Sequence, residues 1–175
     1  MKKLTHLIIF ITILCNLDGK VLNTSKFISP GNEFVATIIK NGYSQNIEVT
    51  NLSNGKIIGN IKTGTIIESL QWLPQSKGIV TVRHMAKESY CTVNYIDKFE
   101  ITEKTYVPEI TPPEKDKPFV YSSVDNIKIL GDFLKITYET SIQSRDGLHE
   151  KNIESIIKVN TSSKKYTIKE RVLCS

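Results

Sequence analysis

The stretch LKITYETSI at residues 134–142 decides the fold class of this 175-residue chain. Its apolar side chains, Leu134, Ile136, Tyr138 and Ile142, alternate with polar ones. A period of two places alternate side chains on opposite faces of an extended strand. This alternation is typical of an antiparallel strand with one face buried and the other in solvent.

Similar strand-like runs cover most of the chain after residue 19. They are rich in Ile, Val, Thr and Tyr, which favour strands, and turn signals such as Asn41-Gly42 and Asn54-Gly55 separate them. The further runs are 33–40, 45–52, 56–62, 66–72, 78–85, 90–96, 98–106, 119–130, 152–160 and 165–172. The sequence therefore predicts an all-β, mainly antiparallel meander of roughly 10–12 short strands. A β-sandwich or a barrel is the alternative.

The amino terminus has the proportions of a secretory signal peptide. Lys2 and Lys3 precede an apolar core at residues 7–14, which is too short to remain as a spanning helix. We expect removal of residues 1–19 and a periplasmic or extracellular location for the mature chain, 20–175. Lipid anchoring through Cys15 is the alternative, although Leu14 stands where a lipoprotein leader has a small residue.

The charge balance gives little support for nucleic-acid binding. Loss of Lys2, Lys3 and Asp18 with the leader lowers the net charge from +5 to +4. Lysine supplies most of the positive charge and is spread along the chain, whereas nucleic-acid readers usually cluster Arg with exposed aromatics. We therefore expect no nucleic-acid partner and, after leader removal, no membrane span.

The cysteines allow two arrangements once Cys15 is removed. Cys91 and Cys174 form an even pair in an oxidising compartment, and a bridge between them would close a loop worth about 4 kcal/mol on the chain-entropy model. The alternative is a buried free Cys91 and a loose Cys174. We predict the disulfide. No C-x-x-C motif is present, which argues against thiol-redox catalysis.

A proline-rich segment at 107–118 interrupts the strand pattern. It carries four prolines, which cannot donate to a sheet ladder, so we expect a loop. We interpret it as an excursion within a single β-rich domain, 20–175, rather than as a domain boundary.

A repeat of about 44 residues relates the first two parts of the mature chain. Pro30 aligns with Pro74, and the alternating residues that follow align as well. A third, poorer copy follows the proline-rich segment and lacks the proline. The further aligned pairs are Val35 with Ile79, Thr37 with Thr81, Ile47 with Cys91, and Val49 with Val93.

Residues 26–105 resemble the β-propeller repeats of the TolB and WD type. The turn Ser29-Pro30-Gly31-Asn32, the later turn at Asn54-Gly55 and the Trp72-Leu73-Pro74 segment carry this resemblance. It implies blade-like units and binding at a surface or channel mouth. Because propellers typically use about 4–8 blades, three units imply an open fragment or assembly with other chains.

No residue pattern indicates a reaction. His84 and His149 lie far apart in the sequence, no metal-ligand spacing occurs, and no known catalytic or cofactor motif is present. We therefore expect no catalytic residue, no metal and no cofactor. The remaining candidates are three aromatics that either pack in the core or form a contact patch: Trp72, Tyr90 and Tyr95.

These observations favour an exported, non-enzymatic β-protein that acts as a macromolecular interaction module. We expect an unidentified protein partner, and oligomerisation is open. The alternatives are a small-ligand-binding barrel or sandwich and an unrecognised hydrolase.

Overall fold

The computed structural model of the protein describes residues 25–97, 100–109, 118–144 and 150–173. These residues form twelve β-strands and one short 3-10 turn, Pro74–Ser76. The strands make three antiparallel sheets of four, and each sheet is a meander in chain order. The all-β prediction is confirmed, and the barrel alternative is wrong because each described sheet has two open edges. The expected leader and residues 110–117 of the proline-rich segment lie outside the described ranges.

Each sheet corresponds to one of the three units seen in the sequence. The first sheet contains β1 (Ser25–Ile28), β2 (Phe34–Asn41), β3 (Ser44–Asn51) and β4 (Ile57–Lys62). The second contains β5 (Ile66–Trp72), β6 (Gly78–Met85), β7 (Glu88–Asp97) and β8 (Glu100–Tyr106). The third contains β9 (Phe119–Leu130), β10 (Phe133–Gln143), β11 (Glu150–Asn160) and β12 (Tyr166–Leu173).

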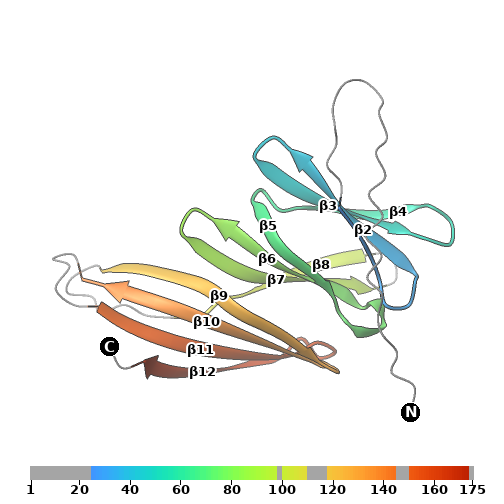
Figure 1. Cartoon of the computed structure of the whole chain (residues 1–175). Coiled ribbons are helices and arrows are strands. Elements are labelled where there is room, and N and C mark those ends of the chain that lie inside the picture. Colours follow the sequence, from blue (N-terminus) through green and yellow to red (C-terminus); the bar gives the residue numbers. More distant parts are fainter. Residues whose placement is uncertain (1–24, 98–99, 110–117, 145–149, 174–175) are drawn as a thin grey trace, which may run out of the picture.

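The second sheet lies between the other two (Figure 1). One apolar core, which includes Ile47 and Ile79, fills the space between the first and second sheets. The other, which includes Val93 and Ile136, fills the space between the second and third. As a result β6 is buried on both faces from Gly78 to Arg83. Three sheets stacked face to face in this way are compatible with a propeller-like arrangement of blades.

The repeated turns of the first two units lie against each other. Ser29 follows β1, and its Oγ accepts hydrogen bonds from the amides of Glu33 and Phe34, at 3.2 and 3.1 Å. Ser76, in the corresponding turn of the second unit, donates its Oγ–H to the Ser29 Oγ at 2.9 Å. The indole Nε1 of Trp72 donates to the Phe27 carbonyl at 2.9 Å. The turns that carry the sequence repeat therefore also join the first two sheets.

The hydroxyl group of Tyr138 connects the third sheet to the second, where two further tyrosine hydroxyls lie together. The Cys91 amide donates to the hydroxyl oxygen of Tyr138 at 2.7 Å, and that hydroxyl donates to the Tyr106 carbonyl. The hydroxyls of Tyr95 and Tyr106 are 2.8 Å apart. These groups are buried, so each bond replaces one lost to water on folding.

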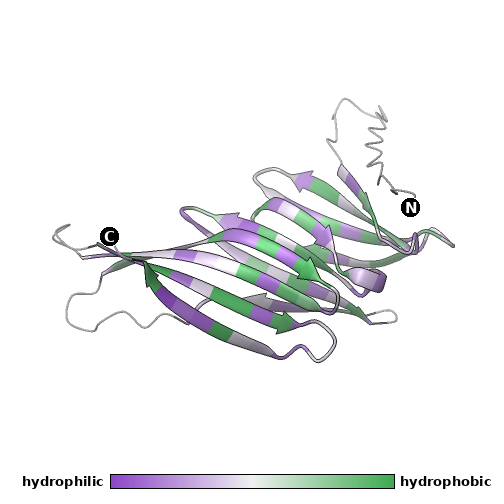
Figure 2. Ribbon diagram, turned by 60° about the horizontal axis from the view of Figure 1, so that its bottom comes forward, coloured by the Kyte–Doolittle hydropathy of each residue, from purple (hydrophilic) through white to green (hydrophobic). Residues whose placement is uncertain are grey.

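The alternation of apolar and polar residues is visible along the strands in Figure 2. In the first and third sheets one face packs on the second sheet, while the other is the outer face. The outer faces therefore point away from the second sheet.

Candidate functional site

The outer face of the first sheet carries a row across its four strands in which three of the four side chains are apolar. Cα pairing places Ile28 opposite Val35, Val35 opposite Thr50, and Thr50 opposite Ile57. Both ends of the row are accessible to solvent, because Ile28 is 57% exposed and Ile57 is 48% exposed. Antiparallel sheets usually turn a polar face to solvent. This apolar row, Ile28, Val35, Thr50 and Ile57, therefore leaves apolar surface without a packing partner in the described chain.

Charged side chains lie in the next row of the same face. Lys26 pairs with Thr37, and Thr37 with Glu48. Both signs of charge therefore flank the apolar row. A partner surface that covers the row would meet Lys26 and Glu48 at its rim.

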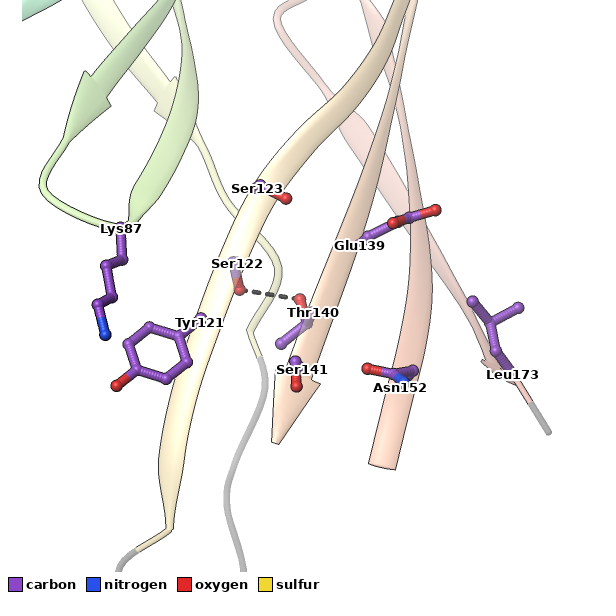
Figure 3. A pocket seen from close by; sticks show the side chains of 9 residues that line it. All are labelled: Lys87, Tyr121, Ser122, Ser123, Glu139, Thr140, Ser141, Asn152 and Leu173. Carbon is purple, nitrogen blue, oxygen red and sulfur yellow. Dashed lines mark hydrogen bonds between the residues drawn. The ribbon is translucent and has the colours of Figure 1, made fainter. Parts of the chain in front are cut away.

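The outer face of the third sheet contains a hollow of about 430 Å³ that is lined mostly by polar side chains (Figure 3). Its floor follows two rows of paired residues, in which Tyr121 lies opposite Ser141 and Ser123 opposite Glu139. Lys87, in the turn between β6 and β7, extends beside Tyr121 with its Nζ 5.3 Å from the ring centre. The full lining is Lys87, Tyr121, Ser122, Ser123, Glu139, Thr140, Ser141, Asn152 and Leu173.

Most side chains that line this hollow can form hydrogen bonds. The hydroxyls of Ser122 and Thr140 lie 2.8 Å apart. Glu139 offers a carboxylate, Asn152 an amide and Lys87 an ammonium group. The hollow can hold a small polar ligand, with the Tyr121 ring as its apolar wall.

The aromatic candidates from the sequence do not gather at one place. Trp72 is half-buried and stacks on Phe34 with ring centres 6.4 Å apart, between the first and second sheets. Tyr95 is buried and bonded to Tyr106, between the second and third. Tyr90 is half-buried on β7. Trp72 and Tyr95 therefore pack between sheets, which was one of the two alternatives, and a contact role for the three rings stays a prediction.

The Cys91 thiol has no disulfide partner among the described residues, and it is fully buried in the core between the second and third sheets. Burial raises the pKa of the Cys91 thiol to about 12, and the nearby Arg83 charge offsets only part of this effect. A thiol with a raised pKa is a poor nucleophile at neutral pH. Cys174 lies outside the described residues, so the Cys91–Cys174 bridge stays a prediction.

A buried charge lies between the first and second sheets. Arg83 is 3% exposed, and its Nη2 contacts the Glu103 carboxylate at 2.5 Å. Its Nε and both amide atoms of the buried Asn94 have no hydrogen-bond partner in the part of the chain that the structure describes. Sequence reasoning missed this pair because Arg83 and Glu103 are twenty residues apart, and only the meander brings β6 and β8 to either side of β7.

The histidine candidates do not form a site. His84 is exposed at the end of β6 and does not line the hollow, and His149 lies outside the described residues. Within the described ranges no cluster of three His, Cys, Asp or Glu has metal-binding geometry. The described part of the chain also has no helix long and apolar enough to cross a membrane.

Comparison with known proteins adds little to these observations. No family model matches the chain, and no curated protein matches it. Among solved structures, the chain is similar to a protein from Lactobacillus plantarum, with 13% sequence identity and a TM-score of 0.40. The similarity covers 84% of this chain, and the chain spans 55% of the length of that protein.

Proposed function

We propose that this protein is an exported, non-enzymatic interaction module built from propeller-type repeats of the TolB and WD kind. The observation that carries the proposal is the apolar row on the outer face of the first sheet. Its partner is a protein that presents an apolar β-sheet face. That face packs on the row as the second sheet packs on the opposite side.

Two observations support the apolar row as the site that binds a partner. The second sheet has neighbours on both faces and is buried on both, so face-to-face stacking is how this chain buries its sheets. The third sheet exposes Leu130 and Phe133 only beside its β9–β10 turn, whereas the half-exposed Ile28 and Ile57 of the first sheet lie at opposite ends of a row across all four strands. An apolar patch on an otherwise polar surface is typical of an interaction site. The two ends of the stack therefore differ, and the first sheet is the end that takes a further sheet.

Export is part of the proposal and rests on the sequence of residues 1–19. A basic start followed by a short apolar core is the pattern of a cleaved leader. Mass spectrometry of the envelope or medium fraction should find a mature amino terminus near Lys20. Retention of residues 1–19 would contradict export by cleavage.

The partner proposal is tested with Ile28→Ser/Ile57→Ser, which makes the apolar row polar without touching a core residue. The matched control, Leu130→Ser/Phe133→Ser, removes an exposed apolar pair from the third sheet. We expect saturable capture of one envelope protein by the wild type and the control, and at least tenfold weaker capture by the first variant. Equal capture by all three proteins, or no saturable partner, would contradict the proposal.

Self-association is a separate outcome of the same test. Light scattering of the purified chain measures whether a second copy occupies the apolar row. If the wild type is a dimer and Ile28→Ser/Ile57→Ser is a monomer, the partner at the apolar row is a second copy of this chain. If the wild type is a monomer, the proposed partner remains a different protein.

The hollow on the third sheet favours a second candidate function, the binding of a small polar ligand. Its volume is within the range of ligand pockets, roughly 300–1,000 Å³. Chemical-shift mapping with a panel of amino acids and monosaccharides would test it. Shifts confined to Tyr121, Ser141 and Asn152 would support it, and an unchanged spectrum with the whole panel would contradict it.

A further inference from the structure

Three lysines form a row across the outer face of the third sheet. Cα pairing places Lys128 opposite Lys135 and Lys135 opposite Lys158, on three adjacent strands. Neighbouring strands are about 4.8 Å apart, so the row spans about 10 Å, close to one Debye length at physiological salt. In the described part of the chain no acidic group forms an ion pair with any of the three.

This row opposes folding. Like charges directly opposite each other on a sheet are destabilising. The acidic side chains of the same face lie further along the strands: Glu139 is four residues from Lys135, about 13 Å away. The sheet therefore keeps three positive charges side by side without neutralising them, and an anionic partner would relieve their repulsion.

Two exposed apolar side chains lie next to the lysines. Leu130 and Phe133 pair with each other where β9 turns into β10, and they are 63% and 55% exposed. Phe133 is two residues before Lys135, and Leu130 two residues after Lys128, so all four share one face. The turn between them consists of Gly131 and Asp132, and Asp132 is its one acidic side chain.

The spacing of the two rows fits an interface between water and lipid. Residues two apart on a strand are about 7 Å apart, so the lysines lie about that distance behind the apolar tip. Amphipathic helices that lie in the membrane interface bury their apolar face about 5–10 Å into the headgroup and acyl boundary, and a strand end can reach the same depth. Lysines at headgroup depth then meet the negative surface potential of anionic lipids.

We propose that the end of the third sheet docks on the surface of an anionic lipid bilayer. Leu130 and Phe133 enter the acyl boundary, and Lys128, Lys135 and Lys158 contact the lipid phosphates. A lipid surface is favoured over nucleic acid because only one of the two exposed apolar side chains, Phe133, is a ring on which a base could stack, and the lysine row contains no arginine. This docking surface lies on the opposite end sheet from the apolar row and does not depend on the partner proposed there.

Flotation with lipid vesicles tests the proposal on the full chain. We expect binding to vesicles of 70% phosphatidylcholine and 30% phosphatidylglycerol, and none to phosphatidylcholine alone. Lys128→Gln/Lys135→Gln/Lys158→Gln should weaken binding roughly fivefold for each lysine and about a hundredfold in total. Leu130→Ser/Phe133→Ser should weaken it at least tenfold, because the apolar contact is lost.

The matched control removes the same charge elsewhere. Lys40, Lys56 and Lys62 are exposed on or beside the first sheet, and their triple glutamine variant should bind anionic vesicles like the wild type. Circular dichroism and thermal unfolding establish that each variant is folded. The five substituted side chains are exposed or half-buried, so we expect little change in either measurement.

Three outcomes would overturn the proposal. The first is no binding of the wild type to anionic vesicles. The second is an equal loss in both triple variants, which would reflect net charge alone. The third is binding of single-stranded DNA as tight as binding of the vesicles, together with no effect of Leu130→Ser/Phe133→Ser on either affinity. That result would show that the lysine row binds polyanions in general.

Discussion

Tyr138 joins two sheets through a single hydroxyl group. It accepts a hydrogen bond from the Cys91 amide and donates one to the Tyr106 carbonyl, and all three groups are buried. Removal of the hydroxyl leaves a buried donor and a buried acceptor without partners. The aromatic ring would still fill its place in the core between the second and third sheets.

We therefore expect Tyr138→Phe to lower the free energy of unfolding by about 1–3 kcal/mol. Urea unfolding measures this loss. Tyr43→Phe is the matched control, because Tyr43 is fully exposed and its hydroxyl faces water. A Tyr138→Phe variant as stable as the control would show that the hydroxyl does not join the sheets.

The buried Cys91 thiol distinguishes the two cysteine arrangements. A free, protonated Cys91 in the core reacts with a thiol reagent only after the protein unfolds. Exported protein that shows no reactive thiol even in denaturant would carry the predicted bridge to Cys174. Protein whose Cys91 reacts in the native state would contradict its burial.

Several buried acidic groups make the fold sensitive to alkali. Burial raises the pKa of Cys91 from 9.0 to about 12, and burial also raises the pKa of Tyr95, Tyr106 and Tyr138 above 10.0. Above pH 9 the unfolded chain loses these protons before the folded one, so it binds fewer protons and stability falls as pH rises. We expect the urea midpoint to decrease from pH 9 to 11. A midpoint that stays constant or rises would contradict this prediction.

At the scale of the elements, strand pairing brings together an ion pair that the sequence keeps apart. Arg83 on β6 reaches across β7 to Glu103 on β8, with its side chain 4% exposed and that of Glu103 43% exposed. A second pair, Arg171 with Glu154 at 3.1 Å, joins β12 to β11, and Arg171 is largely exposed. The two pairs have the same chemistry and differ in burial.

Removal of the acid should therefore have unequal effects in the two pairs. Glu103→Gln leaves Arg83 buried without its counter-ion, and we expect a loss of about 1–3 kcal/mol in the free energy of unfolding. Glu154→Gln should cost less than about 1 kcal/mol, because Arg171 stays hydrated. Chemical unfolding of both variants makes the comparison, and equal losses would show that burial of Arg83 does not matter.

At the scale of the whole molecule, the stack has one sheet with two neighbours and two sheets with one neighbour each (Figure 1). Local opening of an end sheet exposes one core, whereas opening of the second sheet exposes both. Stability against local opening should therefore be highest in the middle of the stack.

Hydrogen exchange should show this gradient. We expect the amides of β6 and β7 to exchange most slowly, and those of the edge strands β1 and β12 to exchange fastest among the strands. Exchange followed residue by residue with NMR provides the measurement. Uniform protection across the three sheets would show instead that they open only together.

Much of the secondary structure was predictable from the sequence. The period-two runs and the turns that contain Asn-Gly are local signals, and they gave most strands within two residues of their observed bounds. Residues 119–130 match β9 at both ends. The exception is β1, Ser25–Ile28, which is too short to show a period and is defined by its pairing with β2.

The all-β class, the three units and the turns follow from the sequence alone, because these depend on side-chain alternation and backbone preferences within a few residues. Which face of each sheet is covered depends on the tertiary structure. It also created the apolar row, the lysine row and the Arg83–Glu103 pair. Each of these combines residues from different strands, so each depends on strand register and on face-to-face packing, which no local pattern specifies.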